Sequence, residues 1–159
     1  MSGQFHTMCE SDFAEVLRLW AQTEGVGLNE LDTPAQLSHY LRRNPGMSFV
    51  ARDGGEIVGA VLCGHDGRRG YLHHLAVAKS HRRRGLGKKL VEMCLARLAE
   101  IEVQKCNIFL FADNADGEGF WKHNGWANRD DLCVMQRVLH PAPKADSRTR
   151  DKQPSNENP

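Results

Sequence analysis

The sequence has no long apolar run and no excess of charge of either sign. None of its apolar stretches approaches the ~20 residues that a membrane-spanning helix needs. The formal net charge over 159 residues is +1, so no strong overall field directs the chain to nucleic acid or to a membrane. The first six residues lack the basic and then apolar pattern of a secretory signal.

Cysteine is sparse and no Cys-x-x-Cys motif is present. The five cysteines are dispersed: Cys9, Cys63, Cys94, Cys106 and Cys133. An odd, scattered set is typical of reduced thiols, so we expect a cytoplasmic protein. All but Cys9 lie in apolar runs, so we expect them to be small core residues, and we expect no metal site.

The length suits one domain with its own hydrophobic core, which we place at residues 1–140. Residues 141–159 contain no large apolar side chain. Such a segment cannot bury a core, so we expect a disordered C-terminal tail.

The rest of the chain reads as strands and helices of an α/β (α+β) protein. We expect strands at residues 4–8, 48–52, 56–63, 71–78, 106–111 and 133–139. We expect helices that begin at Asp12 and at Thr33-Pro34, and two more over residues 85–101 and 116–123. The nearly continuous apolar run 106–111 is typical of a strand covered on both faces.

The stretch 71–87 organises the chain as strand, turn and helix. A buried strand is followed by a polar turn, and Gly85-Leu86-Gly87 then opens the long helix. The apolar side chains of that helix are spaced by three or four and share one face: Leu86, Leu90, Cys94, Leu98 and Ile101. Glycines let a ligand approach the backbone, and the free amides of a first helical turn attract anions. With three arginines and two lysines nearby, the turn is predicted to bind a diphosphate.

The hexapeptide Arg82-Arg83-Arg84-Gly85-Leu86-Gly87 matches the signature Arg/Gln-x-x-Gly-x-Gly/Ala and so resembles the pyrophosphate turn of the GNAT N-acetyltransferases. Leu75-Ala76-Val77 resembles the strand whose backbone pairs with pantetheine in that family. Asn114 and Phe120-Trp121-x-x-x-Gly125-Trp126 resemble its next motif, Asn and then Phe-Tyr-x-x-x-Gly-Phe. The resemblance covers residues 5–139.

The resemblance implies a GNAT fold, with a mixed, mostly antiparallel central sheet flanked by helices on both faces. Strands 71–78 and 106–111 would be a parallel pair joined by the 85–101 helix. It also implies transfer of an acetyl group from acetyl-CoA to a small-molecule amine or to a protein or peptide amine, by a monomer or a homodimer. The implied acetyl-CoA-binding residues are Leu75, Ala76, Val77, Arg82, Arg83, Arg84, Gly85, Leu86, Gly87, Lys88, Asn114 and Trp121.

The base is expected on the central strand. Simple alternation would place Tyr71, His73, Leu75 and Val77 on one face and Leu72, His74 and Ala76 on the other. The segment also resembles the strand of the arylalkylamine N-acetyltransferases, in which a His-Leu-His-x-Leu-Ala-Val pattern carries the base. That resemblance makes His73 the expected base, while a structural role for His73 and a catalytic role for His74 both stay open.

Trp121 departs from the family, because it stands where the family's acidic tyrosine is expected. An indole N–H has no useful acidity, so the thiolate would leave unassisted or take a proton from water, Tyr71 or His123. This departure leaves a non-catalytic acyl-CoA-binding module as the alternative, and a nucleic-acid-binding protein as a distant third. The acidic residues Glu24, Glu30 and Asp32 would either attract a cationic amine or simply be solvated, as acidic loops usually are.

Overall fold

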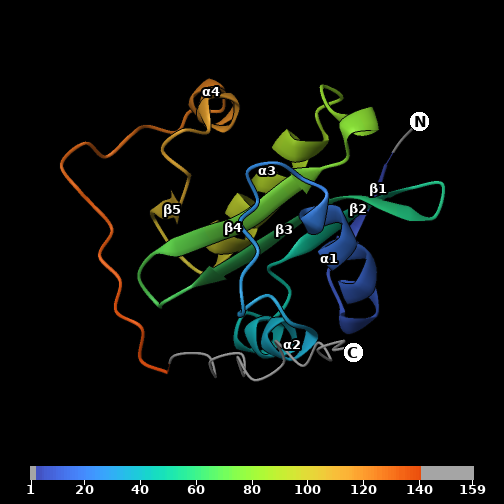
Figure 1. Cartoon of the computed structure of the whole chain (residues 1–159), viewed down its shortest axis with the longest axis horizontal. Helices are drawn as coiled ribbons and strands as arrows, with labels where there is room; N and C mark the ends of the chain where they lie inside the picture. Colours follow the sequence, from blue (N-terminus) through green and yellow to red (C-terminus); the bar gives the residue numbers. More distant parts are fainter. Residues whose placement is uncertain (1–2, 141–159) are drawn as a thin grey trace, which may run out of the picture. The chain divides into compact units, whose positions relative to one another are not determined.

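Strands that follow one another in the sequence also lie side by side in space. The computed structural model describes residues 3–140 and contains one five-stranded sheet in the order β1-β2-β3-β4-β5 (Figure 1). The strands are β1 (Gln4–Thr7), β2 (Phe49–Asp53), β3 (Glu56–His65), β4 (Gly70–Val77) and β5 (Cys106–Ile108). The first four pair antiparallel, and β4 and β5 pair parallel. The mixed, mostly antiparallel sheet and its parallel pair are thus confirmed.

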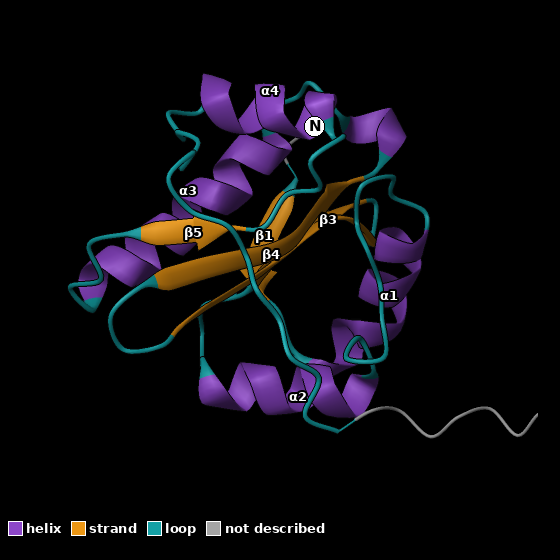
Figure 2. Ribbon diagram, turned by 60° about the vertical axis from the view of Figure 1, so that its left-hand side comes forward, coloured by secondary structure: helices purple, strands orange, loops and turns teal. Residues whose placement is uncertain are grey.

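Helices cover both faces of this sheet, as predicted (Figure 2). They are α1 (Phe13–Ala21), α2 (Pro34–Arg43), α3 (Leu86–Glu100) and α4 (Ala115–His123), with the 3-10 turns η1 (Glu10–Asp12) and η2 (Lys79–His81). On one face Leu90 of α3 and Trp121 of α4 share a core. On the other face Trp20 of α1 and Leu37 of α2 share a second core. No helix of residues 3–140 combines the length and the apolar character needed to cross a bilayer.

Helix α3 forms where the apolar spacing predicts it and connects β4 to β5. Leu90, Cys94 and Leu98 are buried, and Val91 joins them. Complete burial of one such leucine contributes about 1.5–3 kcal/mol. Ile101 follows the helix and is 47% exposed, so the apolar face ends one turn earlier than the sequence suggests.

The N-terminal ends of two helices show how local sequence sets the boundaries. Thr33 caps α2, with its hydroxyl oxygen 3.3 Å from the amide of Gln36, and Pro34 occupies the first turn as predicted. Asp12 precedes α1 but does not cap it. Its carboxylate accepts hydrogen bonds from the Cys9 amide at 2.9 Å and from Arg52 at 2.8 Å. Asp12 therefore fastens η1 to β2.

Of the predicted strands, one is shorter in the structure and one is absent from the described residues. The strand expected over 106–111 ends at Ile108, and Phe109 and Phe111 are 60% and 56% exposed. The prediction that this run is covered on both faces is therefore wrong, and Cys106 is only half-buried. Apolar content alone does not make a strand, because each strand also needs a backbone partner along its length.

Residues up to Asn128 form one compact unit, and residues from Arg129 onward form a second that we describe by itself. Arg129 and Asp131 make a paired contact at 2.8 and 2.7 Å within a turn. The strand expected at 133–139 is absent from the described residues, and Cys133 is exposed rather than a core residue. The apolar residues of this segment do not alternate, so no single face favours pairing in a sheet. The tail expected at 141–159 lies outside the described residues.

Candidate active site

The far edge of β4 is open over its second half. β4 pairs with β5 only through Gly70–Cys106, Tyr71–Asn107 and Leu72–Ile108, although β4 continues to Val77. The amide of Ala78 donates to Val58 of β3 at 2.8 Å. Because backbone groups alternate in an antiparallel pair, the amide and carbonyl of Val77 must point away from β3. The Val77 amide on this open edge is therefore available to a ligand.

Arg82 ties the following turn to this edge. Its Nε donates to the Val77 carbonyl at 3.1 Å, so the guanidinium braces the strand end from the turn. Sequence reasoning gave Arg82 a ligand-binding role. The structure places it at the junction between the edge and the turn.

The turn before α3 has a backbone that favours glycine. Gly85 is the N-cap with φ 79° and ψ 0°, and Arg83 also has a positive φ of 59°. Lys89 donates the first intrahelical bond, to the Gly85 carbonyl at 2.9 Å. The amides of Leu86, Gly87 and Lys88 precede that bond and have no carbonyl of the helix to bind.

The residues around the turn fit a diphosphate. Arg83, Arg84, Lys88 and Lys89 are exposed, so their side chains can reach an anion, and the helix N-terminus adds a partial positive charge. A Cβ at Gly85 would meet no atom within 4 Å, which shows that glycine is needed there for its conformation rather than for space.

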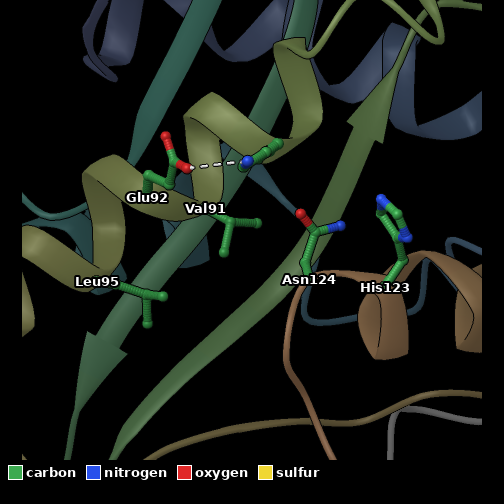
Figure 3. A pocket seen from close by; sticks show the side chains of 6 residues that line it. Val91, Glu92, Leu95, His123 and Asn124 are labelled. Atoms are coloured by element: carbon green, nitrogen blue, oxygen red, sulfur yellow. Dashed lines mark ion pairs between the residues drawn. The ribbon is translucent and has the colours of Figure 1, made fainter.

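A small groove lies beside this turn, between α3 and the end of α4 (Figure 3). It has a volume of about 240 Å³ and is lined by Lys88, Val91, Glu92, Leu95, His123 and Asn124. Lys88 and Glu92 form an ion pair at 3.8 Å on its α3 side. His123, a candidate acid in the sequence, lines this groove on the α4 side.

A β-bulge in β4 breaks the alternation expected from the sequence. Ala60 pairs with Ala76, but Leu62 pairs with His73, so β4 carries one extra residue there, and His74 has φ 53°. Leu72 lies in the core on the α3 side, whereas Ala76 lies in the core on the α1 side. The prediction that Leu72 and Ala76 share a face is therefore wrong, as is the prediction that His73 and Leu75 do.

His73 lies in an aromatic cluster on the α2 side of β4. Its ring stacks on Tyr71 at 6.3 Å and on Phe109 at 6.0 Å, and meets the edge of Tyr40 at 6.2 Å between centroids. Burial lowers the pKa of His73 below 6.5, and the neighbouring charge of His74 adds to this, while Asp32 opposes it. Among residues 3–140, His73 has no hydrogen-bond partner.

His74 has a carboxylate partner. Its Nε2 lies 2.8 Å from Oδ1 of Asp32, and the two side chains are 20% and 8% exposed. Trp20 of α1 packs edge-on against the same imidazole, with 5.0 Å between ring centroids. The bulge thus directs both histidines to the α1/α2 side of the sheet.

The loop between α1 and α2 brings Asp32 to this position. A Cβ at Gly25 would lie 2.6 Å from the Asn114 amide nitrogen, and one at Gly27 would lie 2.6 Å from the Phe111 ring. The loop therefore packs against the segment between β5 and α4. Asn114 also caps α4, accepting from the Gly117 amide at 2.9 Å.

The sequence profile of the Acetyltransferase (GNAT) family matches residues 13–126. The chain belongs to this family. It is 29% identical over 133 residues to "Acetyltransferase YE1169" of Yersinia enterocolitica, which covers 82% of this chain and 92% of that protein. The structure of the PaiA N-acetyltransferase of Thermoplasma acidophilum in complex with coenzyme A matches with a TM-score of 0.73 at 14% identity, covering 82% of this chain and 92% of that chain. The structure of AAC(6')-Iy in complex with the bisubstrate analogue CoA-S-monomethyl-acetylneamine matches with a TM-score of 0.70 at 14% identity, covering 87% and 99%.

Membership in the GNAT family makes this chain an acetyl-CoA-dependent acetyltransferase with a GNAT fold. The two solved structures are below 25% identity and show the fold alone.

Trp121 occupies the tyrosine position of the GNAT signature and is largely buried at 9% exposure. It packs edge-to-face on Trp126 at 4.8 Å and on Phe120 at 5.2 Å. These contacts place the indole in the core shared with α3. Its role toward acetyl-CoA stays a prediction.

Sequence reasoning missed the partners of both histidines. Asp32 and His74 are 42 residues apart, and no local pattern links them. Phe109 was expected inside a strand, but it stacks on His73. The acidity of the 23–32 loop was the one available signal, and it did not single out Asp32.

Proposed function

We propose that this GNAT enzyme transfers the acetyl group of acetyl-CoA to a primary amine on a small molecule or a peptide. The open edge of β4, which leads directly into the basic turn at Gly85, is the observation that carries the proposal. A ligand with a peptide-like arm and a diphosphate matches this sequence of backbone groups followed by cationic groups.

The chain's own residues meet the first requirement of the reaction, which is positioning. The α3 amides and the exposed arginines bind the diphosphate, and the backbone of Leu75 and the amide of Val77 face the pantetheine arm. The reacting thioester then lies near the β4 bulge, where the ladder with β5 ends. Asn114 caps the start of α4.

The second requirement is an acceptor nitrogen without its proton. The histidine pair of β4 faces the α1/α2 side, where Asp32 adds a negative charge that favours a cationic amine. Tyr71 and His73 form an aromatic surface with Phe109 at the same place. Amines with an apolar or aromatic body are thus the acceptors that the site favours.

A non-catalytic acyl-CoA-binding protein is the second candidate, and Trp121 is the observation that favours it. A buried indole cannot replace an acidic phenol as a proton donor. A thiol has an ordinary pKa of about 8.5, so its thiolate can leave without a protein acid. That argument makes the enzyme the stronger candidate.

The test is an acceptor panel with acetyl-CoA, followed by release of free thiol and by mass spectrometry of the product. The panel contains polyamines, arylalkylamines, neamine and short peptides with a free N-terminus. Transfer to any of them supports the proposal. CoA binding by calorimetry without transfer to any acceptor would favour the binding protein, and no CoA binding at millimolar ligand would reject both.

A further inference from the structure

We propose that His74, oriented by Asp32, is the base that takes the proton from the acceptor amine. The assignment rests on the proposed amine acetylation. It differs from the expectation based on sequence, which favours His73. The observation behind it is the hydrogen-bonded pair of His74 and Asp32 at the bulge of β4.

The bulge puts His74 at the mouth of the open edge. Leu72 is the last residue of β4 paired with β5, and His74 follows it by two residues. His74 is also adjacent to Leu75, where the segment expected to hold pantetheine begins. Its φ of 53° is uncommon for a residue other than glycine, and such backbone strain is concentrated at functional sites.

The contacts of the ring fix which nitrogen can accept a proton. A carboxylate oxygen only accepts hydrogen bonds, so Nε2 of His74 must donate to Asp32. The neutral imidazole then has its lone pair on Nδ1. Trp20 packs against the ring and limits its rotation, and 20% of the His74 side chain stays exposed. An oriented imidazole that is still reachable is suited to general-base catalysis.

Asp32 presents Oδ1 to His74, while its Oδ2 accepts a hydrogen bond from the Asn29 amide at 2.9 Å. Its side chain is only 8% exposed, and in a buried setting a hydrogen-bonded carboxylate stabilises the imidazolium that forms on proton uptake. Asp32 is therefore a positioning residue that acts through His74. The indole nitrogen of Trp20 is also buried, but no described residue accepts a hydrogen bond from it.

His73 lacks this arrangement. Within residues 3–140 its imidazole has no hydrogen-bond partner, and three aromatic rings lie next to it. Its neutral form is the one that such a site favours. His73 is thus suited to contact the body of the acceptor rather than to hold its proton.

The reaction balances with one base. Transfer to R–NH3⁺ forms one N–C bond, breaks one C–S bond and releases one proton overall. Nδ1 of His74 takes the first proton, and the nitrogen lone pair then attacks the carbonyl carbon. As the C–S electron pair leaves with sulfur, the second proton of the nitrogen passes to that sulfur. His74 finally returns its proton to solvent.

The test compares His74→Gln, His73→Gln and the control His39→Gln in the full chain, using the best acceptor of the panel. His39 is exposed on α2 and lies outside the site. We expect His74→Gln to lower kcat/KM by roughly 10²-fold or more, to leave the Kd for CoA unchanged and to abolish the acidic limb of the pH profile. His73→Gln should raise KM and keep that limb, and His39→Gln should match the wild type.

A second pair of variants separates proton transfer from a structural contact. Asp32 of the loop is hydrogen-bonded to His74, the charge of His74 acts on the neighbouring His73, and α1 packs Trp20 against the ring. Asp32→Asn removes the charge that favours imidazolium, so the acidic limb should move to lower pH and kcat should fall. His74→Ala should regain activity with added imidazole, which a purely structural role would not allow.

The outcomes also separate this inference from the proposed function. A wild-type chain that acetylates no amine overturns the proposed function itself. A wild type that is active, together with a His74→Gln variant that keeps its rate and its acidic limb, overturns only the role of His74. Loss of the limb in His73→Gln alone would return the role of base to His73. If His74→Gln does not fold, the shift in Asp32→Asn and imidazole rescue of His74→Ala decide the matter, and absence of both overturns it.

Discussion

The imidazole Nε2 of His81 lies 3.0 Å from Oδ2 of Asp53, at the end of β2. This contact joins the β2–β3 hairpin to η2, which leads into the turn before α3. The two side chains are only 19% and 25% exposed, so the contact is partly shielded from water. The hairpin thereby braces the turn that is proposed to bind the diphosphate.

Asp53→Asn should weaken CoA binding without direct contact to the ligand. Losing one partly shielded hydrogen bond of about 1 kcal/mol corresponds to a roughly fivefold rise in Kd, which calorimetry can measure. The matched control is Glu100→Gln, which removes an exposed ion pair with Arg97 on α3. Equal Kd values for the two variants would show that the hairpin does not position the turn.

Gly85→Ala should weaken CoA binding more than its cost in stability suggests. A Cβ in the left-handed region costs about 1–2 kcal/mol, and the backbone will shift to relieve that strain, which moves the α3 amides. Gly46→Ala is the control, because Gly46 has φ 73° and, like Gly85, no atom within 4 Å of its Cβ position. Both variants should melt earlier, but only Gly85→Ala should lose CoA affinity. An equal effect on affinity would contradict the proposed location of the diphosphate.

Arg52→Met should destabilise the fold by roughly 3 kcal/mol, because it leaves the carboxylate of Asp12 buried without its cation. Arg52 binds Asp12 at 2.8 Å and Glu15 at 3.0 Å. Urea unfolding measures the change. The control Arg97→Met removes only an exposed pair and should cost less than about 1 kcal/mol.

The contacts of Asp12 with Arg52 and Cys9 also make the stability of the fold depend on pH in the acid range. Burial alone would raise the pKa of Asp12, but hydrogen bonds from the Cys9 amide and from Arg52 lower it overall. The unfolded chain then takes up protons first as the pH falls, so the stabilisation is present above pH 4 and is lost below it. Arg52→Met should lose less stability between pH 5 and 3 than the wild type, and parallel curves would contradict this.

His73 should titrate below its ordinary value. Burial and the charge of His74 lower the pKa of His73 below 6.5, while Asp32 opposes the shift. His74→Gln should therefore raise the pKa of His73 and Asp32→Asn should lower it, as followed by NMR of the imidazole protons. Because the folded pKa is depressed, protonation of His73 costs native stability as the pH falls below 6.5. A midpoint at or above 6.5 in the wild type would contradict the buried aromatic site.

Patterns among residues close together in the sequence account for most of the fold. The spacing of Leu90, Cys94 and Leu98 defines the buried face of α3, and Thr33 with Pro34 sets the start of α2. The turn before α3 has two residues in the left-handed region, Arg83 and Gly85. These features need only neighbouring residues, and the sequence contains them.

The site depends on features that local rules do not contain. One extra residue in β4 between Leu72 and Ala76 turns His74 to the face of His73, and periodicity alone cannot reveal such a bulge. The pairing of His74 with Asp32 depends on how the loop between α1 and α2, residues 22–33, packs against Phe111 and Asn114. The prediction of a strand at 133–139 is wrong for a related reason. A strand needs a neighbouring strand to pair with, and the composition of a segment does not show whether one is there.

The three-pair ladder between β4 and β5 has a consequence for measurement. The amide of Val77 lies at the C-terminal end of β4 and points to the side where β5 has already ended. It should therefore exchange its hydrogen for deuterium faster than the amide of Ala78, which donates to Val58. If pantetheine occupies this edge, CoA should slow deuterium uptake at Val77 and leave Ala78 unchanged. Deuterium uptake at Val77 thus shows whether a ligand occupies the edge of β4, before any acceptor is known.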